Sequence, residues 1–116
     1  MPMGRDEDGE GGIAKRLAEY IDGHLGEELS LAMLAEKWHY NPSYLSRTFK
    51  QQMGVNLNAY IAQTRMRRAC EMLNDTDARI GEIARQLGFR DTQYFSSVFR
   101  KHMGMIPQKY RMQKRK

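Results

Sequence analysis

The sequence contains the same pattern twice, at about residues 31–54 and again at about residues 80–104. Each copy has two short amphipathic segments with a turn between them, and each ends in Met-Gly. The copies align with an offset of 50 after the turn and of 49 before it, so the second turn has one extra residue. A repeated two-helix unit of this kind determines how the whole chain can fold. The matching residues are Tyr44, Ser46, Phe49, Met53, Gly54 and Tyr60 in the first copy, and Tyr94, Ser96, Phe99, Met103, Gly104 and Tyr110 in the second.

Both segments of each copy have the apolar spacing and the end signals of short helices. In the second copy Ile80, Ile83 and Leu87 form one apolar stripe. Gly88 then suits the left-handed residue that follows a helix, and Asp91 suits the N-cap of the next helix. A short helix, a turn and a second helix with a polar, basic outer face are typical of a helix-turn-helix unit. One copy alone would fit an ordinary αα-hairpin equally well, but two copies favour the helix-turn-helix.

The remaining segments predict further helices, so we expect an all-α fold. A helix from about Ile13 to Leu25 precedes the first copy, a linking helix from about Leu57 to Leu73 joins the copies, and Pro107 starts a short last helix. The expected N-caps are Ser30, Asn41, Asn56 and Asp91. The expected organisation is a disordered linker or tail at 1–12, a first helix-turn-helix subdomain at 13–54, the linking helix at 55–75, a second helix-turn-helix subdomain at 76–112 and a basic, frayed tail at 113–116.

Positive charge is concentrated in the second half of the chain. The net charge is +5, but residues 78–116 alone carry ten Lys or Arg against Glu82 and Asp91, an excess of +8. Such an excess favours a polyanionic partner, with nucleic acid ahead of an anionic membrane, although solubility alone is the plainer explanation. We expect neither a transmembrane helix, because no apolar run reaches 18 residues, nor a signal peptide, because the acidic N-terminus lacks its charge order.

Two residues of the linking helix stand out. Arg65 lies inside the apolar arc, where it either pairs with a buried acceptor or reaches past the core to an anion; the structural role is favoured. Cys70 is the single cysteine, which excludes an internal disulfide and fits a reducing compartment. Because Cys70 falls mid-helix on the apolar side, we expect a buried packing residue and not a reactive thiol.

The outer faces of the two second helices supply side chains of the kind that contact DNA. Arg47 can donate two hydrogen bonds to O6 and N7 of guanine, and Gln93 can pair in the same way with N6 and N7 of adenine. The other candidates for base contacts are short hydroxyl side chains, namely Ser43, Ser46, Thr92, Ser96 and Ser97. The candidates for phosphate contacts are Lys50, Arg100 and Lys101, with Arg90 in the turn as a weaker one. For each of these residues, a solvated side chain with no partner is the plain alternative.

The length of the linking helix indicates how two units can act together. Seventeen helical residues are roughly 26 Å long. With the width of a unit added at each end, the two second helices would lie about 34 Å apart, close to one turn of B-DNA. Both would then enter successive major grooves on one face of the duplex. Because the copies present different residues, we expect an asymmetric site and not a palindrome.

Three motifs resemble a known family. They are LAxxxxxNPxYLSRxFKxxxG from Leu34, RxxxAxxxL from Arg65 and IxxIAxxxGFxDxxYFSxxFRKxxGxxPxxYR from Ile80. Over about residues 13–111 the chain resembles the AraC/XylS family of DNA-binding domains. The resemblance implies a seven-helix domain with two helix-turn-helix subdomains in a transcription regulator, most often an activator, whose partners are double-stranded DNA and RNA polymerase. The segment NPSYLSRTFK resembles the corresponding segment in the C-terminal domains of two-component response regulators. This resemblance implies a missing N-terminal sensor or receiver domain.

The resemblance also assigns the base contacts to the positions chosen above: Ser43, Ser46 and Arg47 in the first unit, and Thr92, Gln93, Ser96 and Ser97 in the second. Two positions depart from some better-known members. Ser43 is small where they carry a large side chain, and Ser97 stands where they often carry Arg. Arg47 therefore makes the first unit the expected determinant of specificity, with the second chiefly an anchor. The resemblance implies a cytoplasmic, nucleoid-associated protein with no cofactor and no membrane partner, monomeric as an isolated domain.

Two other classes of function compete with DNA binding. An enzyme is not expected, because the sequence has no HExxH motif and no glycine-rich phosphate loop, and its histidines and cysteine lack the spacing of zinc ligands. A helical protein-interaction module or an RNA-binding module is the main alternative. RNA recognition would lead us to expect exposed aromatic side chains for base stacking, whereas the tyrosines here mostly fall on or near the expected core stripes.

Overall fold

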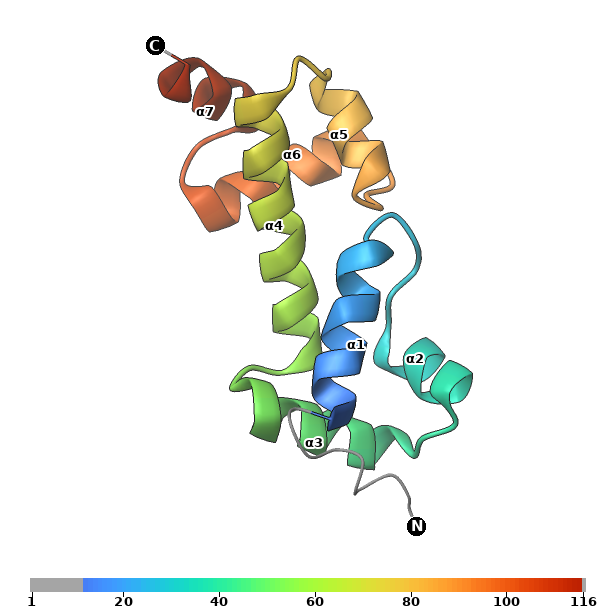
Figure 1. The fold of residues 1–116 in the computed structure, drawn as a ribbon. Helices are drawn as coiled ribbons and strands as arrows, with labels where there is room; N and C mark the ends of the chain where they lie inside the picture. Colours follow the sequence, from blue (N-terminus) through green and yellow to red (C-terminus); the bar gives the residue numbers. More distant parts are fainter. Residues whose placement is uncertain (1–11, 116) are drawn as a thin grey trace. The chain divides into compact units, whose positions relative to one another are not determined.

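The computed structural model describes residues 12–115, which form seven helices and no strand (Figure 1). The helices are α1 (Gly12–Gly23), α2 (Leu31–Trp38), α3 (Pro42–Met53), α4 (Leu57–Asp75), α5 (Ile80–Gln86), α6 (Thr92–Met103) and α7 (Pro107–Lys114). The predicted all-α fold of seven helices is confirmed. The linker or tail expected at 1–12 lies outside the described residues, except that Gly12 is the first residue of α1. Lys116, the last residue of the expected tail, also lies outside them.

The described residues divide into two compact units that share helix α4. The first unit comprises residues 12–24 and 28–62, which include α1, α2, α3 and the start of α4. The second comprises residues 63–115, with the rest of α4, α5, α6 and α7, together with the short loop Leu25–Glu27. In each unit, two consecutive short helices joined by a turn, α2–α3 or α5–α6, form the expected helix-turn-helix (Figure 1).

The repeat extends to the interior of both units. The ring of Phe49 meets that of Tyr60 edge-on, with centroids 5.5 Å apart and planes at 73°. The equivalent rings of Phe99 and Tyr110 lie 5.5 Å apart at 74°. Phe49 and Phe99 are fully buried, and further fully buried side chains come from the stripes that the sequence predicts: Ile13, Leu17, Ile21, Leu34 and Leu45 in the first unit, and Leu73, Ile83, Leu87 and Phe95 in the second. Burial of these apolar stripes is the main stabilising term for helices this short.

The four predicted N-caps all accept a backbone hydrogen bond. The side chain of Ser30 accepts from the amide of Met33 at 3.1 Å, and that of Asn56 accepts from the amide of Ala59 at 2.8 Å. Asn41 caps α3, and Asp91 caps α6. Each cap satisfies an amide that has no partner inside its helix, so both second helices begin at a defined residue.

Both turns contain one residue in the left-handed region, but the residue type differs. In the second copy Gly88 adopts the left-handed region at φ 85, as the sequence predicts. In the first copy the left-handed residue is His39 at φ 62, the only residue other than glycine with positive φ among residues 12–115. Such a conformation is uncommon for a side chain of this size. The left-handed conformation of His39 was not predicted, because glycine is the usual mark of such a turn; histidine is nevertheless one of the residues that adopt it more often than others.

The last turns of α6 and α7 are exposed. In α6, His102 is exposed and Met103 beside it is 36% exposed. At the C-terminus, Gln113 and Lys114 continue α7 and are not frayed. The expected tail therefore begins two residues too early.

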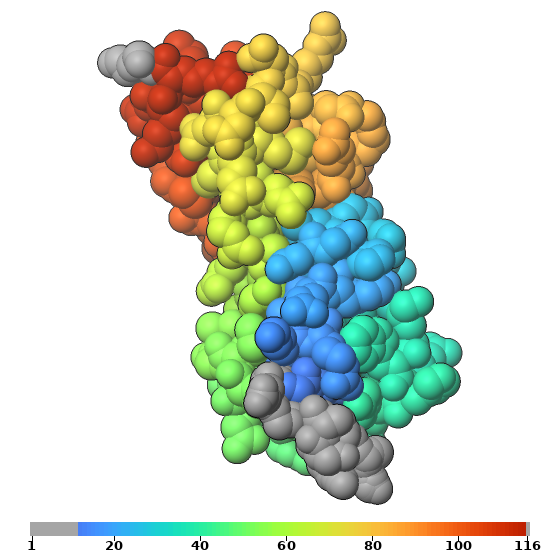
Figure 2. Space-filling view, in the orientation of Figure 1, coloured from blue at the N-terminus to red at the C-terminus, as the bar shows by residue number. Residues whose placement is uncertain are grey.

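In the first unit, the surface of α1 (blue) meets that of α2 (teal) without a break (Figure 2). The rings of Tyr20 and Trp38 meet there edge-on at 6.0 Å. Gln52, at the end of α3, accepts a hydrogen bond from the amide of Ala14 at 3.3 Å. Because α3 is fixed through its buried side, its opposite side faces solvent.

Candidate nucleic-acid interface

Helix α3 presents the predicted contact residues of the first unit on one exposed face. Leu45 and Phe49 are 1% exposed and fix the inner side of the helix. Asn41 accepts hydrogen bonds from the amides of Ser43 at 2.8 Å and Tyr44 at 3.1 Å, which orders the first turn. On the outer side Ser43, Arg47 and Lys50 are exposed, and Ser46 is half-buried. The structure therefore brings the four predicted contact residues of this unit together on one helix face.

Two shallow depressions flank Arg47. The first, of about 370 Å³, is lined by Leu31, Pro42, Ser43, Ser46 and Arg47. The second, of about 550 Å³, is lined by Ser46, Arg47, Lys50 and Gln51. Arg47 and Ser46 line both depressions. The first also has Pro42 and Ser43 and so lies toward the N-terminal end of α3, whereas the second has Lys50 and Gln51 and lies toward the basic C-terminal half.

Helix α6 presents the predicted contact residues of the second unit in the same way. Phe95 and Phe99 are completely buried, so the opposite side of the helix faces out. Gly81 of α5 allows a close approach to the start of α6, because a Cβ atom there would lie 3.1 Å from the hydroxyl oxygen of Thr92. The outer residues Thr92, Gln93, Ser97, Arg100 and Lys101 are exposed, and Ser96 is half-buried like its equivalent Ser46.

Arg90, the weaker phosphate candidate, is held in place by its neighbours. Its guanidinium lies 4.7 Å from the ring centroid of Tyr94, a cation–π contact, and 3.6 Å from a carboxylate oxygen of Asp91. Tyr94 itself is 46% exposed, although the tyrosines were expected mostly on or near the core. Its place next to Phe95 in the helical pattern gave no indication of this, because a residue at the edge of an apolar arc can face either way.

The cations of the two outer faces have no protein partner within residues 12–115. No hydrogen bond, ion pair or ring contact engages Arg47, Lys50, Arg100 or Lys101 in that part of the chain. A cation without an internal partner is available to an external anion, whereas a paired one would have to give up its partner first.

Three other arginines are engaged inside the second unit. Arg65 donates from Nε and Nη2 to the carbonyl oxygen of Leu25 at 3.2 and 3.0 Å, and from Nη2 to that of Glu27 at 3.1 Å. The favoured structural role of Arg65 is confirmed. Burial lowers the pKa of its guanidinium, although an arginine keeps its charge in proteins.

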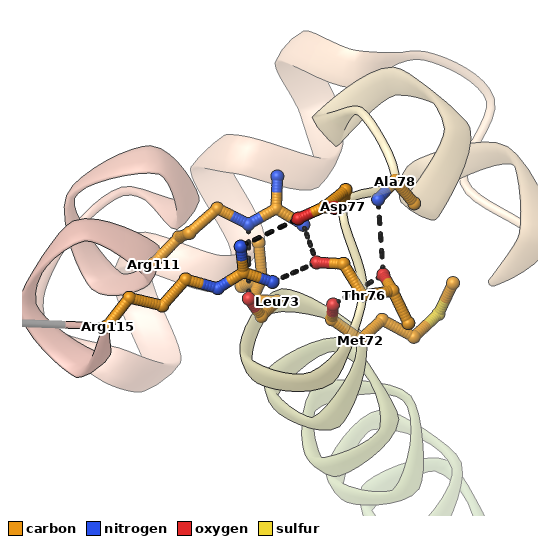
Figure 3. Close-up of polar contacts among 7 residues, drawn as sticks. All are labelled: Met72, Leu73, Thr76, Asp77, Ala78, Arg111 and Arg115. Atoms are coloured by element: carbon orange, nitrogen blue, oxygen red, sulfur yellow. Dashed lines mark hydrogen bonds and ion pairs between the residues drawn. The ribbon is translucent and has the colours of Figure 1, made fainter.

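Arg111 of α7 and Arg115, the residue after that helix, bind the end of α4 and the residues that follow it (Figure 3). Arg111 donates to the carbonyl oxygens of Leu73 and Thr76, each at 3.1 Å. Arg115 donates to the same Thr76 oxygen and forms an ion pair with Asp77 at 2.8 Å. The hydrogen bond and charge of Arg115 lower the pKa of the Asp77 carboxyl. Sequence reasoning missed these contacts, since the basic C-terminus looked solvated.

Cys70 is half-buried and not in the core, so the prediction of a buried packing residue is wrong. It lines a depression of about 350 Å³ together with residues of α4 and α6, including Met66 and His102. A hydrogen bond to Cys70, together with burial, raises the pKa of the Tyr110 phenol. Among residues 12–115, no group of three or more His, Cys, Asp or Glu side chains is arranged to hold a metal ion.

In that same range, no helix is both long and apolar enough to cross a membrane.

Comparison with known proteins identifies the family. The model of a helix-turn-helix domain matches residues 34–113. The regulatory protein PocR of Salmonella typhimurium is 41% identical over 99 residues, which are 85% of this chain and 33% of PocR. The regulatory protein SoxS of the same organism is 36% identical over 99 residues, which are 85% of this chain and 92% of SoxS. The chain thus spans less than half the length of PocR and of several other curated relatives.

A solved structure has the same arrangement of helices. The C-terminal domain of AraT, a response regulator from Geobacillus stearothermophilus, superposes with a TM-score of 0.83 at 37% identity, covering 87% of this chain and 84% of that one. The family match begins within α2 and ends within α7, so it includes α3, the linking helix α4, and α5 with α6. The chain belongs to the AraC-type helix-turn-helix family, the DNA-binding domains of transcription regulators.

Proposed function

We propose that α3 and α6 are the two recognition helices of a sequence-specific reader of double-stranded DNA, and that they enter successive major grooves of one asymmetric site. The observation that carries this proposal is that each of two helix faces combines cations with short polar side chains. Within residues 12–115, Arg47 and Lys50 on α3 and Arg100 and Lys101 on α6 have no protein partner, and each pair shares its helix face with hydroxyl or amide side chains. Cations that flank short hydroxyl and amide side chains suit a groove with phosphates on both sides.

The roles within each face follow from reach and position. Arg47 is proposed to contact guanine, and Gln93 to contact adenine, because each can form two hydrogen bonds to the major-groove edge of its base. The hydroxyls of Ser43, Ser46, Thr92, Ser96 and Ser97 are proposed to contact bases directly or through water. Lys50, Arg100 and Lys101 lie further along the helices and are proposed to neutralise phosphates, with Arg90 as a weaker contributor.

A DNA-reading domain of this kind is expected to act as one part of a longer regulator. We take the chain to be the output domain of a transcription activator in the cytoplasm. Such a regulator contacts RNA polymerase and carries a sensor or receiver domain N-terminal to this one. AraT is itself described as a response regulator, and its C-terminal domain is the one that superposes on this chain. The isolated domain is proposed to be monomeric, because its two units replace the two halves of a dimeric reader, and to have no catalytic activity.

Selection of binding sites from a random pool of duplex DNA tests this proposal. We expect one enriched site of about 20 base pairs, with two unlike half-sites about one helical turn apart. A palindromic site, or a single half-site no longer than one turn, would contradict the arrangement of two different recognition helices on one duplex.

An RNA-binding module is the competing function, and the 46% exposure of Tyr94 is the one observation that favours it. Exposed aromatic rings stack on unpaired bases in many RNA-binding proteins. Competition separates the two: single-stranded RNA of matched length should displace the selected duplex only at a large excess. Displacement at equal concentration would make the RNA reading the better one.

A further inference from the structure

The depression at the N-terminal end of α3 has a chemical character unlike the rest of the basic face. Its lining combines the hydrocarbon side chains of Leu31 and Pro42 with the hydroxyls of Ser43 and Ser46 and with Arg47. Leu31 is half-buried and Pro42 is exposed. A hollow with two hydrocarbon side chains, beside a guanidinium that has no partner within residues 12–115, is suited to a ligand that has an apolar group next to polar ones.

The shape of the depression is fixed before any ligand binds. Ser30 caps α2 immediately before Leu31, and Asn41 caps α3 immediately before Pro42. Asn41 also accepts the hydrogen bond from the amide of Ser43 at 2.8 Å, which orders the backbone next to the hollow. The space above that backbone stays open because Ser43 has a short side chain, whereas the equivalent position of the second copy is the longer Gln93.

Only one base presents an apolar group in the major groove. Thymine carries a C5-methyl group there, next to its O4 acceptor, whereas the other bases present hydrogen-bonding groups. We propose that the depression receives the edge of a thymine, with its methyl group against Leu31 and Pro42, in the base step next to the guanine that Arg47 contacts. The hydroxyls of Ser43 and Ser46 line the same depression and are available to the thymine O4. This inference rests on the proposed function and names part of the sequence that the first unit recognises.

Replacement of thymidine by deoxyuridine in the duplex isolates the methyl group, because the two nucleosides differ only in that group. Loss of one buried methyl group corresponds to roughly a fourfold weaker binding. In the selected duplex, each thymine is replaced in turn and the dissociation constant is measured by fluorescence anisotropy. We expect a fourfold loss at one thymine of the first half-site, next to the guanine whose preference is lost in Arg47→Ala.

Filling the depression supplies the second arm of the test. Ser43→Leu occupies the space of the methyl group, and Ser43→Gln imports the residue of the second copy, so both should bind the thymine and deoxyuridine duplexes equally. Gln93→Ala is the matched control, because it changes the equivalent position of α6 and should leave the fourfold ratio at that thymine intact. Ser43 is exposed, so neither substitution should disturb the fold, and circular dichroism is the measurement that checks this for each variant.

The outcomes separate the two proposals. If a site is selected but no thymine of the first half-site responds to deoxyuridine, or if Ser43→Leu keeps the full response, the methyl contact is wrong and the proposed function stands. If no duplex is selected at all, the proposed function fails and the methyl contact fails with it.

Discussion

The clamp formed by Arg65 gives the sharpest test of how the second unit is held together. Its guanidinium donates three hydrogen bonds to two backbone carbonyls, those of Leu25 and Glu27, over distances of 3.0 to 3.2 Å. The same group lies 5.9 Å from the ring centroid of Phe89. Arg65→Met keeps most of the aliphatic stem and removes every donor. Leu25 is only 5% exposed, so its carbonyl has little access to replacement water.

The cost can be worked out from these contacts. A hydrogen bond from a charged group contributes about 1.5–3 kcal/mol net. The three bonds share one guanidinium, which is half-exposed, so they are not additive and each belongs at the low end of the range. We expect Arg65→Met to lower the free energy of unfolding by about 3 kcal/mol. For a domain of this size that corresponds to roughly 10–20 °C in melting temperature.

Thermal melting followed by circular dichroism measures the effect, and the chain offers a matched control. Arg67 lies two residues further along α4, is exposed and has no partner within residues 12–115. Arg67→Met should therefore change the stability by less than about 0.5 kcal/mol. Arg65→Lys should fall in between, because an ammonium group cannot span two carbonyls as the planar guanidinium does. If Arg65→Met melts within a degree or two of Arg67→Met, the clamp does not stabilise the fold and the reasoning is refuted.

Three further predictions concern backbone, acid stability and binding. Gly88→Ala should cost about 3 kcal/mol in thermal melts, because its Cβ would lie 2.8 Å from a backbone oxygen at φ 85; Gly54→Ala, at φ 84 with nothing within 4 Å, should cost only about 1 kcal/mol. The lowered pKa of Asp77 stabilises the fold at pH values above the ordinary carboxyl pKa of about 3.9, and this stability is lost as the pH falls through the folded-state pKa. Below about pH 4, the urea unfolding midpoint of Asp77→Asn should therefore change less with pH than that of the unaltered protein. Arg47→Ala should weaken binding to the selected site by about 1–3 kcal/mol and remove the preference for one base. Lys101→Ala should weaken binding to all DNA sequences alike and reduce the slope of log affinity against log salt concentration by about 1. The reverse pattern would show that their roles are exchanged.

Local signals in the sequence were sufficient for most of the fold. Ser30, Asn41, Asn56 and Asp91 each lie at the start of an apolar stripe, and each caps its helix. These signals act over three or four residues, which is why one sequence is enough to find them. The repeat then supplied the pairing of helices into two units, because the same buried positions recur in both copies.

Contacts between distant residues could not be predicted in this way. Arg115 meets Asp77 across 38 positions, and nothing near either residue marks the pair. The exposed ring of Tyr94 and the half-buried Cys70 lie at the edges of apolar arcs, where a small rotation of the helix decides between core and solvent. The phosphate candidate Arg90 was identified from its charge, but its stacking on Tyr94 depends on the backbone of the turn.

The two copies keep the same interior and differ on the outside, and this bears on where specificity arises. Phe49 with Tyr60 and Phe99 with Tyr110 have the same centroid distance and interplanar angles of 73° and 74°. Each second helix is therefore held by the same kind of contact to the helix that follows it. Because the frameworks agree, a difference in preferred base must come from the outer side chains. At the equivalent positions the first unit has a short serine and an arginine, and the second has Gln93 and Ser97. An open hollow beside a guanidinium and a long amide beside a hydroxyl present different chemistry to the groove, which is why two similar units should recognise two unlike half-sites.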